Sequence, residues 1–186
     1  MPEILIALGA NLPRDADTPR DTLERALAAL GGRAGLTVTA RARWFATPAV
    51  PAGSGPDFVN GAARLTGEAS PAAILEALHE VERDAGRSRP ARWAPRVCDL
   101  DLLAVGDLVL PDAATVRRWM ELDPAEARRA APAEIVLPHP RLQERGFVLL
   151  PLADIAPGWR HPLTGRTVRE MAQALPAEAV RGVHPL

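Results

Sequence analysis

The chain has 186 residues, of which 47% are apolar and 24% charged, and its formal net charge is −1 at pH 7. These values fit one soluble globular domain, and the near-neutral charge argues against a general binder of nucleic acid or membrane surfaces. All 22 basic residues are arginines, which excludes a Walker-type phosphate loop and Schiff-base chemistry. Cys98 is the single cysteine, no apolar run is long enough for a membrane helix, and residues 1–4 do not begin a secretory signal, so we expect a cytoplasmic protein.

The first half of the chain alternates between strand and helix patterns. An apolar run over 4–8 predicts a buried strand, and Thr18 or Asp21 could cap the helix that follows it and ends at a pair of glycines. Alternation over 36–45 then predicts one half-buried strand. The remaining predicted elements of this half are a loop over 47–56, a strand over 57–65, a helix from Ser70–Pro71 to about Gly86 and a second loop over 87–96.

The second half begins with an acidic strand and then contains shorter elements. In order, these are a turn at 106–107 into a strand over 108–110, an insertion at about 112–133 with one or two short helices, an extended segment over 135–141, a helix over 146–152, and a peripheral tail with a turn at 163–165 and a helix over 168–175. The predicted fold class is α+β: a single domain with a ferredoxin-like antiparallel sheet and helices packed on its faces.

Asp99 and Asp101 stand at alternate positions of an apolar strand, so their carboxylates are expected to point to one face. Two carboxylates this close repel each other and are costly to bury unpaired, so a positive group should lie beside them. Mg2+ is commonly held by one or two carboxylates together with substrate phosphates. Arginines within 87–96 suit those phosphates because guanidinium groups bind them bidentately. The pattern predicts a magnesium–nucleotide site; the alternative is a set of solvated arginines and exposed strand-end acids.

Other side chains could complete a site for a flat heterocycle. Trp93 lies among arginines and prolines, so it suits a stacked planar ligand as well as the core. Phe58 and Asn60 share one strand face and offer a stacking surface beside an amide; the alternative is a core Phe and a strand-end Asn. His139, between two prolines, either donates to phosphate or fills a turn. Cys98 is expected to be a small buried apolar residue and not a nucleophile.

A series of short motifs runs across nearly the whole chain. The most specific is Arg-Trp-Ala-Pro-Arg-Val-Cys-Asp-Leu-Asp at 92–101. The others are Ala7-Leu8-Gly9-Ala10-Asn11-Leu12, Thr47-Pro48, Asp57-Phe58-Val59-Asn60, Glu82 with Gly86-Arg87-Ser88-Arg89, Pro138-His139-Pro140-Arg141, Arg145-Gly146-Phe147 and the stretch 151–157. In content and order these motifs resemble the 6-hydroxymethyl-7,8-dihydropterin pyrophosphokinase family of folate biosynthesis.

The resemblance implies transfer of a diphosphate from ATP to the hydroxymethyl group of the dihydropterin, with attack on the β-phosphorus and release of AMP. It implies two Mg2+ ions held by Asp99 and Asp101, with Arg87 and Arg96 as the other catalytic residues. The implied ATP contacts are His79, Glu82, Arg87, Arg89, Trp93, Arg96, Leu102, His139 and Arg145. The implied pterin contacts are Thr47, Pro48, Val50, Phe58, Asn60, Trp93 and Phe147. We expect a monomer that binds these two small molecules and neither nucleic acid nor membrane.

Four departures from the family pattern bear on these expectations. Ala94 replaces the Gly usual before Pro95, and Cys98 stands where an aliphatic residue is common, which is a mild change. His79 stands where Gln is frequent, and the insertion lengthens the connection before Pro138. None of them removes a metal ligand or an implied catalytic arginine, so an active enzyme is expected. A ferredoxin-like module that binds nucleotide or RNA without catalysis is the alternative, and the near-neutral charge and the acidic pair argue against it.

Overall fold

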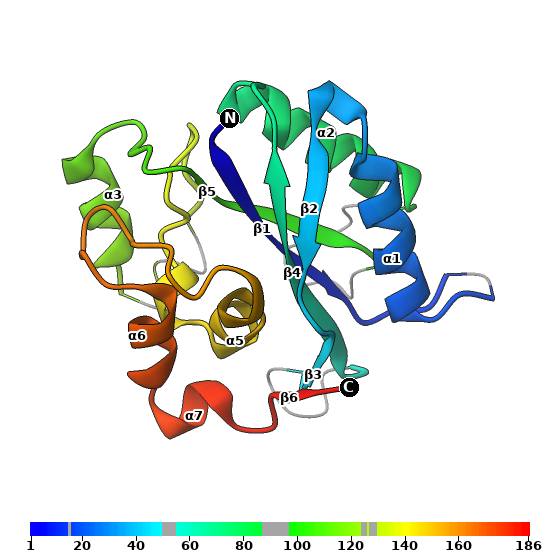
Figure 1. Cartoon of the computed structure of the whole chain (residues 1–186). Helices are drawn as coiled ribbons and strands as arrows, with labels where there is room; N and C mark the ends of the chain where they lie inside the picture. Colours follow the sequence, from blue (N-terminus) through cyan, green and yellow to red (C-terminus); the bar gives the residue numbers. More distant parts are fainter. Residues whose placement is uncertain (15, 50–54, 87–96, 124–125, 127–129) are drawn as a thin grey trace.

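The computed structural model describes residues 1–14, 16–49, 55–86, 97–123, 126 and 130–186 (Figure 1). In chain order its elements are β1 (Glu3–Ala10), α1 (Pro19–Leu30), the 3-10 helix η1 (Arg33–Gly35), β2 (Thr37–Arg41), β3 (Phe45–Thr47), β4 (Phe58–Thr66), α2 (Pro71–Asp84), β5 (Asp99–Val105), α3 (Ala113–Met120), η2 (Leu142–Glu144), α5 (Gly146–Ile155), α6 (Val168–Gln173), α7 (Ala177–Val180) and β6 (His184–Pro185).

One antiparallel sheet organises these elements. Its strand order is β5-β1-β4-β3-β6, and β2 pairs with β4 beside β3. The central strand β1 is apolar and buried from Ile4 to Ala10 rather than alternating, which is the pattern of a strand that is covered on both faces. The predicted α+β fold with helices on an antiparallel sheet is therefore confirmed.

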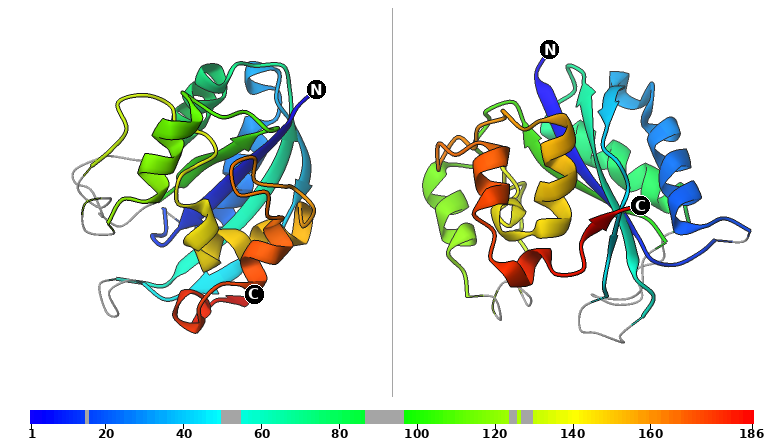
Figure 2. Two further views of the ribbon diagram at one scale, coloured as in Figure 1. Left: turned by 90° about the vertical axis from the view of Figure 1, so that its left-hand side faces the viewer. Right: turned by 60° about the horizontal axis from the view of Figure 1, so that its bottom comes forward.

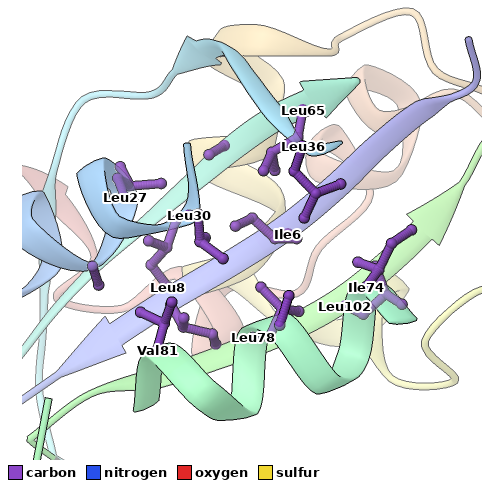
Figure 3. Packing of buried hydrophobic residues seen from close by; sticks show 14 of the residues in the cluster. Ile6, Leu8, Leu27, Leu30, Leu36, Leu65, Ile74, Leu78, Val81 and Leu102 are labelled. Atoms are coloured by element: carbon purple, nitrogen blue, oxygen red, sulfur yellow. The ribbon is translucent and has the colours of Figure 1, made fainter. Parts of the chain in front are cut away.

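Two helical layers cover the sheet, one on each face (Figures 1 and 2). On one face α1 and α2 pack over Ile6, Leu8 and their neighbours, as Figure 3 shows for the larger side chains. On the other face α5 and α6 pack over Leu5, Ala7 and Ala62.

The helix starts follow from local chemistry. Thr18 is the N-cap of α1, and Thr18 and Asp21 form a reciprocal capping box, so both residues named by the sequence take part. Ser70 caps α2, where its hydroxyl accepts a hydrogen bond from the Ala73 N–H at 3.2 Å, and Pro71 occupies the first turn.

Three sequence predictions are corrected. The single strand expected over 36–45 is two strands, because the chain turns between Arg41 and Phe45 and sends Ala42 and Trp44 into opposite cores. Residues 108–110 form no strand; Leu110 makes only an isolated bridge to another segment. The tail is not peripheral, since α6 buries its apolar face in the second core.

The region of the predicted insertion contains α3, which Asp112 caps through a bond from the Thr115 N–H at 2.9 Å. Residues 124–125 and 127–129, where a second short helix was expected, lie outside the described residues. The interpretation of about 112–133 as an insertion stays a prediction. Within the described ranges, no helix has the length and apolar character required to cross a membrane.

Candidate active site

Asp99 and Asp101 lie on β5 and face the same side of the sheet, as predicted. Their partners across the ladder on β1 are Gly9 and Ala7, respectively. Both aspartates are half-buried. The residues opposite them are small, since Gly9 has no side chain and Ala7 has only a methyl group. The carboxylate oxygens are therefore accessible to a ligand from this face.

Arg145 supplies positive charge beside the pair. Its Nη1 lies 3.9 Å from Asp101 Oδ2, and its side chain keeps 22% exposure. Burial lowers the pKa of the guanidinium, an effect that the nearby Asp101 opposes, and an arginine stays charged at any working pH. The guanidinium also lies 5.7 Å from the ring centre of Phe147, which is 38% exposed on α5.

His139 is held next to this charged group as a neutral ring. Its backbone N–H donates to the Leu103 carbonyl at 2.8 Å, and its Nδ1 accepts from the Arg141 N–H at 3.1 Å. Burial, followed by the charge of Arg145, lowers the pKa of His139 to about 3. A neutral imidazole whose Nδ1 accepts a bond carries its proton on Nε2, so His139 presents an N–H donor.

The opposite wall of the site belongs to β3 and β4. Asn60 is 6% exposed, and its Nδ2 donates a hydrogen bond to Thr47 Oγ1. Phe58, two residues away on the same face of β4, is half-buried and pairs with Thr47 in the ladder. Pro48, which directly follows Thr47 in the chain, is exposed. The predicted amide and aromatic surface is therefore present on one strand face.

Gly9 joins the two walls. In the ladders of β1 it pairs with Asn60 on one side and with Asp99 on the other. A Cβ at this position would lie 2.8 Å from Asn60 Oδ1. The absence of a side chain at Gly9 therefore keeps the amide in place and leaves the space between the amide and the carboxylate open.

Three more of the predicted nucleotide contacts lie on β5 and on α2, which packs against it. Glu82 is 2% exposed on α2, and its carboxylate accepts the Leu100 N–H at 2.8 Å, which fixes the start of β5. The Leu102 side chain packs in the core beside Ile74 (Figure 3), so a nucleotide contact at this residue would use its main chain. His79 is half-buried on α2. Nucleotide binding by these residues stays a prediction.

Part of the predicted site lies outside the described residues. It comprises Val50, Arg87, Arg89, Trp93 and Arg96, and the departure Ala94 belongs to the same stretch. Cys98, by contrast, is described and is fully buried, as predicted.

The donor set fits a cation that is shared with phosphate. Among the described residues, no cluster of three or more His, Cys, Asp or Glu side chains could form a closed metal site. Mg2+ does not need such a cage, because it is commonly held by one or two carboxylates plus substrate phosphates and water. Asp99 and Asp101, both half-buried on one face of β5, supply two such carboxylates, and phosphate binding by the neighbouring Arg145 and His139 stays a prediction.

Sequence reasoning missed two parts of the site. Gly9 belongs to a motif that the sequence displayed, but its place between Asn60 and Asp99 depends on strand register. Asn11 is 3% exposed, and its Nδ2 donates to the Pro56 carbonyl at 3.1 Å, so it ties the end of β1 to the start of β4. A buried Asn directly after a buried strand was the available signal for this second role.

Comparison with known proteins gives a consistent answer. The sequence pattern of the 7,8-dihydro-6-hydroxymethylpterin-pyrophosphokinase family matches residues 5–157. A Synechocystis protein named 2-amino-4-hydroxy-6-hydroxymethyldihydropteridine pyrophosphokinase is 33% identical over 181 residues, which cover 97% of this chain and 80% of the relative. The Pseudomonas aeruginosa protein of the same name is 33% identical over 177 residues, which cover 95% of this chain and 94% of the relative.

Solved structures agree on the fold. A Plasmodium falciparum HPPK-DHPS triple mutant with pteroate has a TM-score of 0.62 at 13% identity, covering 99% of this chain but only 46% of its own. A second triple mutant of that protein gives a TM-score of 0.61 at 14% identity, over 92% of this chain and 44% of its own. This chain thus spans less than half of those proteins. The family match over most of the sequence and the two relatives of similar length show that the chain belongs to the 7,8-dihydro-6-hydroxymethylpterin-pyrophosphokinase family.

Proposed function

We propose that this protein transfers a diphosphate group from ATP to the hydroxymethyl group of 6-hydroxymethyl-7,8-dihydropterin, with release of AMP, in folate biosynthesis. Relatives of similar length that are named for this activity support the reaction. The single structural observation that carries the proposal is the register of β1, which sets Gly9 between Asn60 and Asp99. A pterin that binds the amide of Asn60 and a phosphate that binds near the carboxylate of Asp99 would meet above Gly9, which has no side chain.

The reaction is a substitution at phosphorus. The hydroxymethyl oxygen forms a bond to the β-phosphorus while the bond from that phosphorus to the oxygen that bridges to the α-phosphate breaks. AMP leaves with the bridging oxygen, and the hydroxyl proton passes to solvent. No covalent enzyme intermediate is needed, because positioning of the two substrates and neutralisation of phosphate charge lower the barrier.

Asp99 and Asp101 would hold Mg2+, and we propose two ions. When bound, Mg2+ would neutralise the negative charge of the phosphates. The chain's own cationic and donor groups contribute to the same neutralisation. Arg145 can bond a phosphate oxygen through its guanidinium, and the neutral His139 can donate from Nε2. Arg87 and Arg96 are assigned to the transferring phosphates by motif position.

On the pterin side, the amide of Asn60 is the group that would read the ring edge. Its carbonyl oxygen accepts from ring N–H groups and its amino group donates to ring acceptors, while Thr47 fixes its orientation. Phe58 and Phe147 supply aromatic faces from β4 and α5, and Trp93 is assigned as a further stacking residue by motif position. Pro48 and Val50 complete the proposed pterin contacts.

The decisive test is AMP release from MgATP with and without the dihydropterin. Pterin-dependent AMP is expected from the wild type and a loss of at least about 100-fold from Asp99→Asn or Asp101→Asn, since charge stabilisation at the reacting phosphate is lost. Asp107→Asn, at an exposed turn residue, is the control and should retain full activity. Absence of pterin-dependent AMP from the wild type would overturn the proposal. Salt-sensitive RNA binding without turnover would favour the alternative, a ferredoxin-like module that binds nucleotide or RNA without catalysis.

We also expect a monomer without affinity for nucleic acid. Analytical ultracentrifugation of the purified chain and a titration with single-stranded RNA test these two expectations separately from the reaction.

A further inference from the structure

The last segment of the chain crosses from the helical layer to the edge of the sheet. We call residues 176–186 the C-terminal brace; it contains α7 and β6. Figures 1 and 2 show α7 beside α5 and β6 alongside β3, with the chain end at the edge of the sheet. The family match ends at residue 157, so the brace lies beyond it.

On the sheet side, the brace is bonded to the strand that leads into the proposed pterin wall. In the ladder of β6 and β3, His184 pairs with Ala46, and the Leu186 N–H donates to the Trp44 carbonyl at 2.8 Å. Gly182 lies directly against Pro48: a Cβ on Gly182 would be 2.5 Å from Cγ and 2.9 Å from Cδ of that ring. Real Cβ atoms do not approach this closely, so the backbone of the brace is in contact with the proline.

On the helix side, the brace packs against the first residue of α5. A Cβ on Gly146 would run into the carbonyl oxygen of Ala179 in α7. Gly146 immediately precedes Phe147, the aromatic residue of α5 that is assigned to the pterin. We call the start of α5 with Phe147 the α5 wall of the pterin pocket, and β3 with Pro48 the β3 wall. The brace therefore touches both walls of the proposed pterin pocket, at Pro48 on one side and at Gly146 on the other.

From these contacts we propose that the C-terminal brace is a positioning element of the pterin pocket, which fixes the distance between the β3 wall and the α5 wall. The inference rests on the proposed function. Thr47 is bonded to Asn60, so a shift of Pro48 is transmitted to the amide that would read the pterin edge. A wall that is held in its binding position costs less to order when the ligand binds. The phosphate side, built by β5 and Arg145, makes no contact of this kind with Gly182.

Gly182→Ala tests this idea, and the chain offers a matched control. Gly182 has φ +73° and Gly165 has φ +69°, so alanine meets the same backbone strain at both positions. Nothing lies within 4 Å of a Cβ at Gly165, whereas at Gly182 the Cβ meets Pro48. The difference between the two variants therefore isolates the contact with the proline from the strain.

The measurements are the KM for the pterin, the KM for MgATP and kcat. Gly182→Ala should raise the pterin KM about tenfold or more, because a displacement of this size misplaces the ring, and should leave the ATP KM within about twofold. Gly165→Ala should leave all three parameters near wild type. Equal pterin KM values in the two variants, or equal increases in both KM values for Gly182→Ala, would overturn the inference.

A double-variant cycle addresses the risk that Gly182→Ala folds poorly. Pro48→Ala removes the ring that the new methyl group would strike. In that background, Gly182→Ala should add no further increase in the pterin KM, and a full additional increase would overturn the inference. If the wild type shows no pterin-dependent AMP release, the proposed function fails and the inference fails with it; if the wild type is active, only the inference is at stake.

Discussion

Gly9→Ala is the sharpest test of how the two halves of the site are joined. The added methyl group would lie 2.8 Å from Asn60 Oδ1, inside van der Waals contact. The backbone itself is not strained, since Gly9 does not adopt a positive φ. Asn60 therefore has to move, and it gives up its bond to Thr47 and the position proposed for binding the pterin edge.

The magnitude follows from the hydrogen bonds at stake. A neutral hydrogen bond contributes about 0.5–1.5 kcal/mol, so the loss of the donor and the acceptor of one amide costs about 1–3 kcal/mol of pterin affinity. That free energy corresponds to a rise of about 5- to 150-fold in the dissociation constant of the pterin. Binding of MgATP should be unchanged, because Asp99 and Arg145 do not depend on the amide.

Calorimetric titration with the pterin and with MgATP measures the two affinities separately. The control is to introduce Gly9→Ala into an Asn60→Ala variant, which lacks the amide. If the glycine acts through the amide, Gly9→Ala has almost no further effect once Asn60 is alanine. An unchanged pterin affinity in Gly9→Ala would refute the reasoning. An equal loss in both backgrounds would also refute it, since the methyl group would then act on the ligand directly.

Three further predictions follow from the site. His139 should lower stability in acid, because its pKa is about 3 when folded and 6.5 when unfolded, so the unfolded state binds the extra proton between these values. Stability should fall by up to about 1.4 kcal/mol per pH unit between pH 6.5 and pH 3, and urea unfolding should find this slope reduced in His139→Gln. Glu82→Ala should destabilise the fold by about 1–3 kcal/mol, because the buried Leu100 N–H loses its acceptor, whereas Glu82→Gln keeps an acceptor and should cost less in thermal unfolding. Arg145→Lys should retain charge but lose bidentate geometry and reduce kcat/KM about tenfold in the AMP assay; unchanged kinetics would remove Arg145 from the phosphate site.

Local chemistry made several elements predictable. The uninterrupted apolar run of β1, the Thr18 cap of α1 and the Ser70–Pro71 start of α2 are all encoded within a few residues, and the structure contains each of them. The pairing of Asp99 with Asp101 on one face follows from strand geometry alone. Such features need no knowledge of what lies across the sheet.

Features set by distant segments were not predictable in the same way. The break between β2 and β3 arises because Ala42 and Trp44 pack into different cores, although they fit one alternating pattern. The brace contains two prolines and a glycine, which disfavour a regular strand, and its strand exists only because the edge of β3 is available to pair with it. Propensity is a weak guide where tertiary packing decides.

A third long-range feature, a β-bulge in β5, determines to which face of the sheet Asp99 and Asp101 point. In the ladder of β1 and β5, Leu5 pairs with Ala104 but Ile6 pairs with Leu102, so Leu103 is an extra residue on β5. Without this bulge, continuation of the pairing from Leu5 would set Leu8 opposite Asp101, and both carboxylates would turn into the core under α1 and α2.

The bulge therefore turns the carboxylates to the open face while the end of β5 keeps its apolar side chains in both cores. It also explains where the imidazole lies, since the carbonyl of the extra residue, Leu103, is the acceptor for the His139 backbone N–H. One inserted leucine thus orients the two acids and anchors the neutral histidine donor beside them. Bulges are concentrated next to active sites because they re-aim side chains in this way, and here the re-aimed side chains are the ones that would hold the phosphate and its metal.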